Sequence, residues 1–201
     1  MAHRLRLGSA RRRVRSGDRT RVEVRSPEEV HRNFTNGPVL VVADSHTWMA
    51  GAGAQYPDWD TDCRAGRTTA EGVEVVAVNL APRHRVVVFD QATNDCATAA
   101  DEHWRQLLEL RRLLGERQLV LVSSWRTDLS LEHVVANQRR LVAEHPATTS
   151  IADWADFVVS HPQYMAADRH HYTDEAMPIR TGIVWTGVRA AEARIGASGE
   201  G

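Results

Sequence analysis

The fold is indicated by the stretch PVLVVADSH at residues 38–46. Its first five residues form an uninterrupted apolar run, which is typical of a parallel strand covered on both faces. Polar residues follow at once: Asp44, Ser45 and His46. Two similar runs and two shorter segments predict four more strands, at residues 59–63, 86–89, 119–122 and 150–153.

Helical patterns alternate with these strands. Residues 68–71 read Thr-Thr-Ala-Glu, a capping box, and apolar residues then recur at helical spacing up to Leu80. Three longer helices are predicted over residues 98–114, 130–144 and 174–193. This alternation predicts an α/β fold, a three-layer α/β/α sandwich around a flavodoxin-like parallel sheet. Numbered from the strand at 38–42, its strands are expected in the order 2-1-3-4-5.

The predicted topology brings three polar blocks to one edge of the sheet. Ser45 follows the first strand, Gly66 the second and Asn94 the third. In such sheets, ligands bind at the carboxyl ends of the strands, near the point where the strand order reverses. We therefore expect these residues to share a site.

Ser45 and the block Asp168-Arg169-His170-His171 supply the parts of a catalytic triad. A serine between a strand and a helix can attack an acyl carbonyl if a base takes its proton, but it can equally cap the helix. Asp168 lies three residues before His171, close enough to fix the tautomer of that imidazole. His170 is the rival base.

An acyl transfer also needs hydrogen-bond donors aimed at the developing oxyanion. The candidates are the amides of Ser45 and Gly66 and the side-chain amide of Asn94. Gly66 allows a close backbone approach because it has no side chain. The alternative for Asn94 is a turn, because Thr-Asn-Asp is also a turn sequence.

We expect neither a metal nor a cofactor. The sequence has no Cys-x-x-Cys or His-x-x-x-His pair with ligand spacing, and Gly51–Ala54 matches neither a phosphate-binding loop nor a dinucleotide fingerprint. Cys63 and Cys96 are either two free thiols or one disulfide joining two site loops. The remaining histidines without a comparable acidic partner are expected to be surface or capping residues: His46, His84, His103, His133, His145 and His161.

Composition is that of one domain of 201 residues, 42% of them hydrophobic. We divide it into an Arg-rich extension (residues 1–36), a catalytic domain (37–195) and a C-terminal tail (196–201). The extension holds ten arginines and four acids, so it is either a tether for an acidic partner or a loosely packed segment. The net charge of −1 and the lack of aromatic residues among the arginines before Phe34 argue against nucleic acid binding.

The sequence shows neither a membrane span nor a secretory signal. We therefore expect a cytoplasmic protein, or an extracytoplasmic one if the chain is a fragment.

Taken together, these blocks resemble the SGNH (GDSL-type) hydrolase superfamily, and most closely the SGNH domains fused to membrane acyltransferases that O-acetylate cell-surface glycans. The likeness runs from about Gly37 to Ala193. It implies that Ser45 is the nucleophile, that Asp168 and His171 complete the triad, and that Ser45, Gly66 and Asn94 form the oxyanion hole. The resemblance also gives Asn137 and Asp153 structural roles. The chain departs from the family pattern at Ala43 and at Gln91-Ala92, where glycines are usual.

The expected function is a serine-dependent ester hydrolase that acts on short-chain O-acyl esters of a carbohydrate-like or small-molecule substrate. The first alternative is an O-acyltransferase that uses the same triad. The second is a non-catalytic binding module with a basic N-terminal arm.

Overall fold

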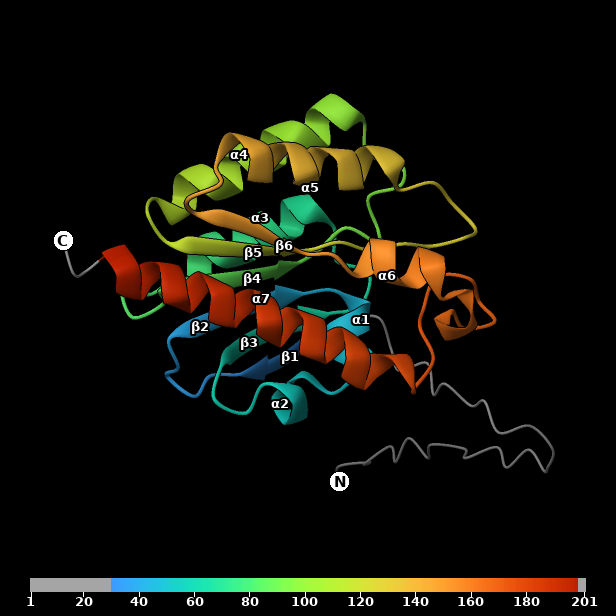
Figure 1. Cartoon of the computed structure of the whole chain (residues 1–201), viewed down its shortest axis with the longest axis horizontal. Helices are drawn as coiled ribbons and strands as arrows, with labels where there is room; N and C mark the ends of the chain where they lie inside the picture. Colours follow the sequence, from blue (N-terminus) through green and yellow to red (C-terminus); the bar gives the residue numbers. More distant parts are fainter. Residues whose placement is uncertain (1–29, 199–201) are drawn as a thin grey trace, which may run out of the picture.

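The computed structural model describes residues 30–198 and contains a six-stranded sheet in the order β1-β3-β2-β4-β5-β6 (Figure 1). Five strands are parallel, namely β2 (Val39–Ala43), β3 (Asp60–Arg64), β4 (Val86–Asp90), β5 (Gln118–Val122) and β6 (Thr149–Ala152). They lie in the predicted order. The sheet also contains a strand that was not predicted, β1 (Val30–Asn33), which pairs antiparallel with β3 at the edge of the sheet.

Strand β1 comes from the predicted N-terminal extension. Two buried aspartates of β3 hold β1 and the residues that follow it. Arg32 Nε donates to Asp62 Oδ2 at 2.7 Å, and the Thr35 amide donates to Asp60 Oδ1 at 2.8 Å. Both aspartates are fully buried, so they need such partners. The preceding arginine-rich residues lie outside the described part of the chain.

Helices cover both faces of the sheet, which confirms the three-layer prediction (Figure 1). Strand β2 shows the division: Leu40 and Val42 pack in one core and Val39 and Val41 in the other. The first core includes α3 (Thr69–Asn79), α4 (Ala100–Leu114) and α5 (Glu132–Glu144). The second includes α1 (Ser45–Met49), α2 (Ala52–Gln55), α6 (Trp154–Ser160) and α7 (Ala176–Ser198). A 3-10 turn, η1 (Pro162–Tyr164), follows α6.

The longer helices match their predictions within a few residues. Thr68 caps α3 in the predicted capping box, with Glu71 bonded back to the Thr68 amide. Helix α7 continues past the predicted end at Ala193, so the predicted tail is helical up to Ser198. Helix α1 lies where a helix was expected after Ser45, while the short helices α2 and α6 were not predicted.

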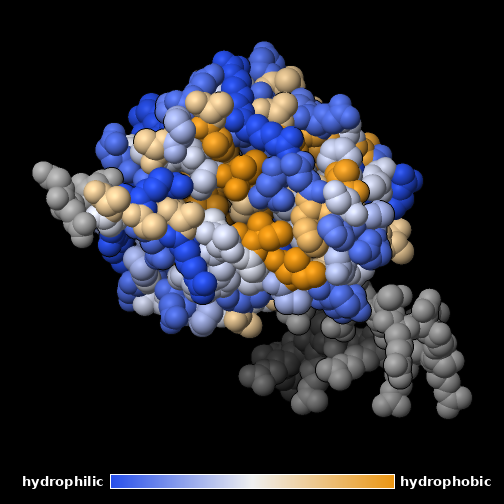
Figure 2. Space-filling model, in the orientation of Figure 1, coloured by the Kyte–Doolittle hydropathy of each residue, from blue (hydrophilic) through white to orange (hydrophobic). Residues whose placement is uncertain are grey.

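Figure 2, in the orientation of Figure 1, shows apolar side chains grouped over the face that α7 covers. A groove between β6 and α7 is lined in part by Ile151, Ile179 and Ile183. Among the described residues, no helix has the length and apolar character needed to cross a bilayer.

Candidate active site

The nucleophile candidate begins a helix at the carboxyl end of β2. Asp44 is the N-cap of α1, because its Oδ1 accepts the amide hydrogen of His46 at 3.0 Å. The main-chain amide of Asp44 donates a hydrogen bond to the Asp90 carbonyl of β4 at 3.0 Å, which fixes the position of Asp44. Since Asp44 supplies the cap, the Ser45 hydroxyl is left for other contacts. The Ser45 residue is 7% exposed.

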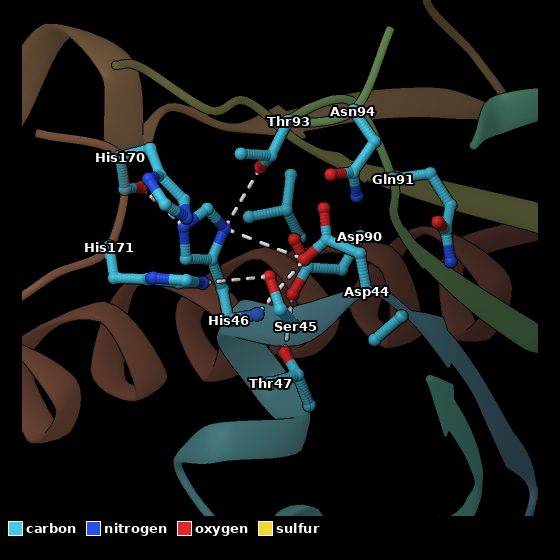
Figure 3. A network of polar contacts seen from close by, with 12 residues as sticks. Asp44, Ser45, His46, Thr47, Asp90, Gln91, Thr93, Asn94, His170 and His171 are labelled. Carbon is cyan, nitrogen blue, oxygen red and sulfur yellow. Dashed lines mark hydrogen bonds and ion pairs between the residues drawn. The ribbon is translucent and has the colours of Figure 1, made fainter. Parts of the chain in front are cut away.

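The structure brings Ser45, His171 and Asp168 into one line of hydrogen bonds, of which Figure 3 shows the contact between His171 and Ser45. Ser45 Oγ lies 3.2 Å from His171 Nε2, and His171 Nδ1 lies 2.7 Å from Asp168 Oδ2. Asp168 Oδ1 also accepts the His171 amide at 2.9 Å. A hydroxyl, an imidazole and an orienting carboxylate in this order can generate a nucleophile.

His170 does not take the position of the base. Its Nδ1 lies 3.3 Å from the Asp168 carbonyl, and its ring lies against that of His171 with centroids 3.8 Å apart. In Figure 3 it is the His171 imidazole that reaches Ser45.

The charges in the line suit proton transfer at neutral pH. Burial alone would raise the pKa of Asp168, but hydrogen bonds from the amide and imidazole of His171 and from the His170 amide outweigh it and hold that pKa at about 2. Burial lowers the pKa of His171 below its ordinary value of 6.5, despite the hydrogen bond to Asp168. His171 is therefore neutral at pH 7 and can accept the serine proton.

The candidate oxyanion donors come from three neighbouring loops. The amides of Ser45 and Gly66 donate no hydrogen bond to any described residue. Gly66 has φ 74°, a left-handed conformation that glycine adopts without strain. Asn94 Nδ2 donates to the Arg67 carbonyl at 3.0 Å, which occupies one of its two N–H groups. Figure 3 shows Asn94 and Thr93 on the loop opposite the start of α1.

Two buried side chains hold these loops in place, and neither was predicted to have a role. Arg67 NH1 donates to the carbonyls of Ala43 and Asp62 at 3.2 and 2.7 Å, and NH2 pairs with Asp62 Oδ1 at 2.5 Å. Asp95 Oδ2 accepts the amide and hydroxyl of Thr69 at 2.9 and 2.8 Å. Arg67 thus ties the loop after β3 to the end of β2, and Asp95 ties the loop after β4 to the start of α3.

His46 corrects a prediction. It was expected to be a surface or capping residue, yet it is completely buried and Asp44 supplies the cap of α1. His84 and His103 are buried as well. The His46 ring lies between Thr93 and the loop that carries His171. His145 and His161 do stand at helix C-caps, as predicted.

The two cysteines and the two residues given structural roles are also located. Cys63 and Cys96 are free thiols, so the disulfide alternative does not apply. Asn137 Nδ2 donates to the Ala100 carbonyl at 2.7 Å and joins α5 to α4. Asp153 caps α6 and accepts from Ser123 Oγ at 2.8 Å.

Three side chains with metal-ligating atoms lie together around the proposed catalytic base, His171. The ligand atoms of Asp168, His170 and His171 lie within 4.8 Å of one another, a spacing that can hold a metal ion. A metal bound there would compete with the hydrogen bond between His171 and Asp168, because that bond occupies His171 Nδ1 and Asp168 Oδ2.

Comparison with known proteins addresses the fold. No family model matches the sequence, and no curated protein matches it. Among solved structures, the chain is similar to the C-terminal catalytic domain of peptidoglycan O-acetyltransferase A from Streptococcus pneumoniae, with TM-score 0.67 and 17% identity over 78% of this chain and 95% of that one. It is also similar to the psychrotrophic esterase EstA from Pseudoalteromonas sp., with TM-score 0.61 and 11% identity over 76% and 96% of the two chains.

A third similar structure is a candidate SGNH hydrolase from Slackia heliotrinireducens, with TM-score 0.58 and 16% identity over 75% of this chain and 97% of that one. These three similarities span most of each neighbour. Together with the parallel sheet and its covering helices, they show that the chain has the SGNH-hydrolase fold.

Proposed function

We propose that this chain is a serine-dependent ester hydrolase that removes short-chain O-acyl groups from a carbohydrate-like or small-molecule substrate. The observation that carries the proposal is the line of contacts from Ser45 Oγ through His171 to Asp168, at the carboxyl edge of the sheet. In a parallel sheet this edge is where ligands bind.

In the proposed reaction, His171 Nε2 takes the proton of Ser45 as Oγ forms a bond to the acyl carbon. The carbonyl oxygen becomes an oxyanion facing the amides of Ser45 and Gly66 and the second N–H of Asn94. The ester C–O bond then breaks as His171 returns the proton to the leaving alcohol, which leaves an acyl-Ser45 enzyme. Water, deprotonated by His171, releases the acid and restores Ser45. Asp168 stabilises the imidazolium throughout.

A polar alcohol portion is supported by the loops beside the base. Arg126, Asp128 and Arg169 lie there. Arg126 pairs with Asp128, and Arg169 donates to the Thr127 carbonyl, which joins the segments around residues 126–128 and 168–171. Such a charged border fits a hydroxyl-rich substrate better than a lipid.

The alternative is an O-acyltransferase in which a sugar hydroxyl takes the place of water in the second half of the reaction. The similarity to a peptidoglycan O-acetyltransferase domain, at a TM-score of 0.67, favours keeping this candidate. Every residue role stays the same, so only the acceptor distinguishes the two reactions.

The first test is turnover of p-nitrophenyl acetate by the wild type, Ser45→Ala and His171→Ala. Ser160→Ala and His145→Ala serve as matched controls, because both residues lie at helix ends away from the Ser45–His171 contact. Loss of turnover in the two site variants alone supports the proposal. Equal rates in all five proteins would reject it and favour a binding module.

The second test separates hydrolysis from transfer. Products are analysed with and without added glycan acceptors: free acid alone supports the hydrolase, while an acylated acceptor that depends on Ser45 supports the transferase.

A further inference from the structure

His46 joins the nucleophile helix to the loop that carries the base. It is the second residue of α1, directly after Ser45, and it is completely buried. Its Nε2 lies 2.8 Å from the His170 carbonyl oxygen, and its Nδ1 lies 2.9 Å from Thr93 Oγ1. Thr93 precedes Asn94, so one imidazole contacts the nucleophile, oxyanion and base segments.

The partners of the ring define its hydrogen bonds. A carbonyl oxygen only accepts, so His46 Nε2 carries a proton and donates it to His170. Its Nδ1 faces the Thr93 hydroxyl at 2.9 Å and Asp44 Oδ1 at 3.4 Å. The ring also stacks on Tyr172, with centroids 4.3 Å apart and planes at 22°. Each edge and one face of His46 is thereby engaged.

The contact with His170 clamps a particular peptide bond. That bond joins His170 to His171, and its carbonyl accepts from His46 while its amide donates to Asp168 Oδ1 at 2.9 Å. The two ends of this peptide group point in opposite directions, so bonds at both ends fix its rotation. The side chain of the base leaves the chain at the next atom, the His171 Cα.

We propose that His46 is a positioning residue that holds the His170–His171 peptide so that His171 Nε2 faces Ser45 Oγ. This inference rests on the proposed function of Ser45 and His171. His46 is not itself the base, because its Nε2 is bonded to His170 and its Nδ1 to Thr93 rather than to Ser45.

The test uses two variants that differ in the one donor at issue. Gln at position 46 places an amide nitrogen near the position of the imidazole Nε2, so His46→Gln keeps a donor for the His170 carbonyl. Asn is shorter and reaches only the position of Nδ1, so His46→Asn keeps contact with Thr93 and loses that donor. His84→Asn is the matched control, because His84 is also buried but contacts Asp60 at the opposite end of the sheet.

We expect kcat for p-nitrophenyl acetate to fall about 100-fold in His46→Asn with little change in KM, because a misplacement of about 1 Å has this effect on a reacting group. His46→Gln should retain most of kcat, and His84→Asn should lose stability but not kcat. Thermal unfolding checks that each variant is folded. If His46→Asn does not fold, His46→Leu, which also lacks the donor, replaces it.

A second readout does not need turnover. The imidazole proton between His171 Nδ1 and Asp168 should give a downfield NMR resonance in the wild type and in His46→Gln that is lost or shifted in His46→Asn. Equal kcat in folded His46→Asn and wild type, or equal losses in both His46 variants, would overturn the inference. Absence of Ser45-dependent turnover in the wild type would instead reject the proposed function, and the resonance would still test the role of His46.

Discussion

The side chain of Asn94 donates a hydrogen bond to the main-chain carbonyl of Arg67 at 3.0 Å. Two loops that each carry a candidate oxyanion donor are joined by this bond, because Gly66 directly precedes Arg67. Asn94 therefore has two tasks: one N–H fixes the spacing of the loops and the other is left for the oxyanion. A single residue thus couples the shape of the site to its chemistry.

Asn94→Ala should lower kcat/KM about 10²–10³-fold, the usual effect of removing one oxyanion donor. The change also removes the bond to Arg67, so KM should rise as the loops separate. Steady-state kinetics with p-nitrophenyl acetate measure both effects, and Asn137→Ala, which breaks a side-chain bond between two helices instead, is the control. Unchanged kinetics in Asn94→Ala would exclude Asn94 from the oxyanion hole.

Arg67→Met should lower the free energy of unfolding by about 3 kcal/mol. Arg67 is 2% exposed and its partner Asp62 is fully buried, so the substitution leaves a carboxylate in the interior with less compensation. Arg32 still contacts Asp62, which keeps the loss at the lower end for a buried pair. Urea unfolding provides the measurement.

Arg112→Met is the control for Arg67→Met. Its pair with Glu109 lies at the surface, where the Arg112 side chain is 70% exposed, so the change should cost less than about 1 kcal/mol. Equal stabilities of the two variants would show that the Arg67–Asp62 pair does not hold the loop.

The sequence predicts the parallel part of the sheet because its strands carry their own signal. Residues 39–42, 86–89 and 119–122 are apolar on both faces, and the structure buries all of them between two helical layers. Strand β1 has no such signal, since its sequence is VHRN and it half-faces the solvent. It forms because Asp62 and Asp60, about thirty and twenty-five residues away, bind Arg32 and Thr35. Only a three-dimensional arrangement reveals those partners.

Some residues of the candidate site could likewise be predicted from the sequence, and others could not. Asp168 and His171 are three residues apart, so their contact follows from the spacing, and the positions of Ser45, Gly66 and Asn94 follow from strand order. The role of His46 does not, because its main contact is separated by 124 residues. Helices α2 and α6 were also missed, because four and seven residues are too few to show helical periodicity.

The rate should depend on pH through His171. Only the neutral imidazole accepts the Ser45 proton, so kcat/KM should rise with pH as His171 loses its proton. Burial lowers the pKa of His171, which places the midpoint of this acidic limb below 6.5. Asp168 stays ionised across the whole range, since its pKa is about 2. The profile is measured on the wild type and on His145→Ala, which should coincide with it.

Asp168→Asn should move the same limb further toward low pH. The carboxylate of Asp168 raises the pKa of His171 through its hydrogen bond and its charge, and an amide supplies no such charge. The rate at the plateau should also fall about 10⁴-fold, because Asn no longer holds the imidazole in the tautomer that accepts from serine. A midpoint that shifts upward in Asp168→Asn, or a wild-type midpoint above 6.5, would mean that His171 is not the base and that another group titrates in the rate.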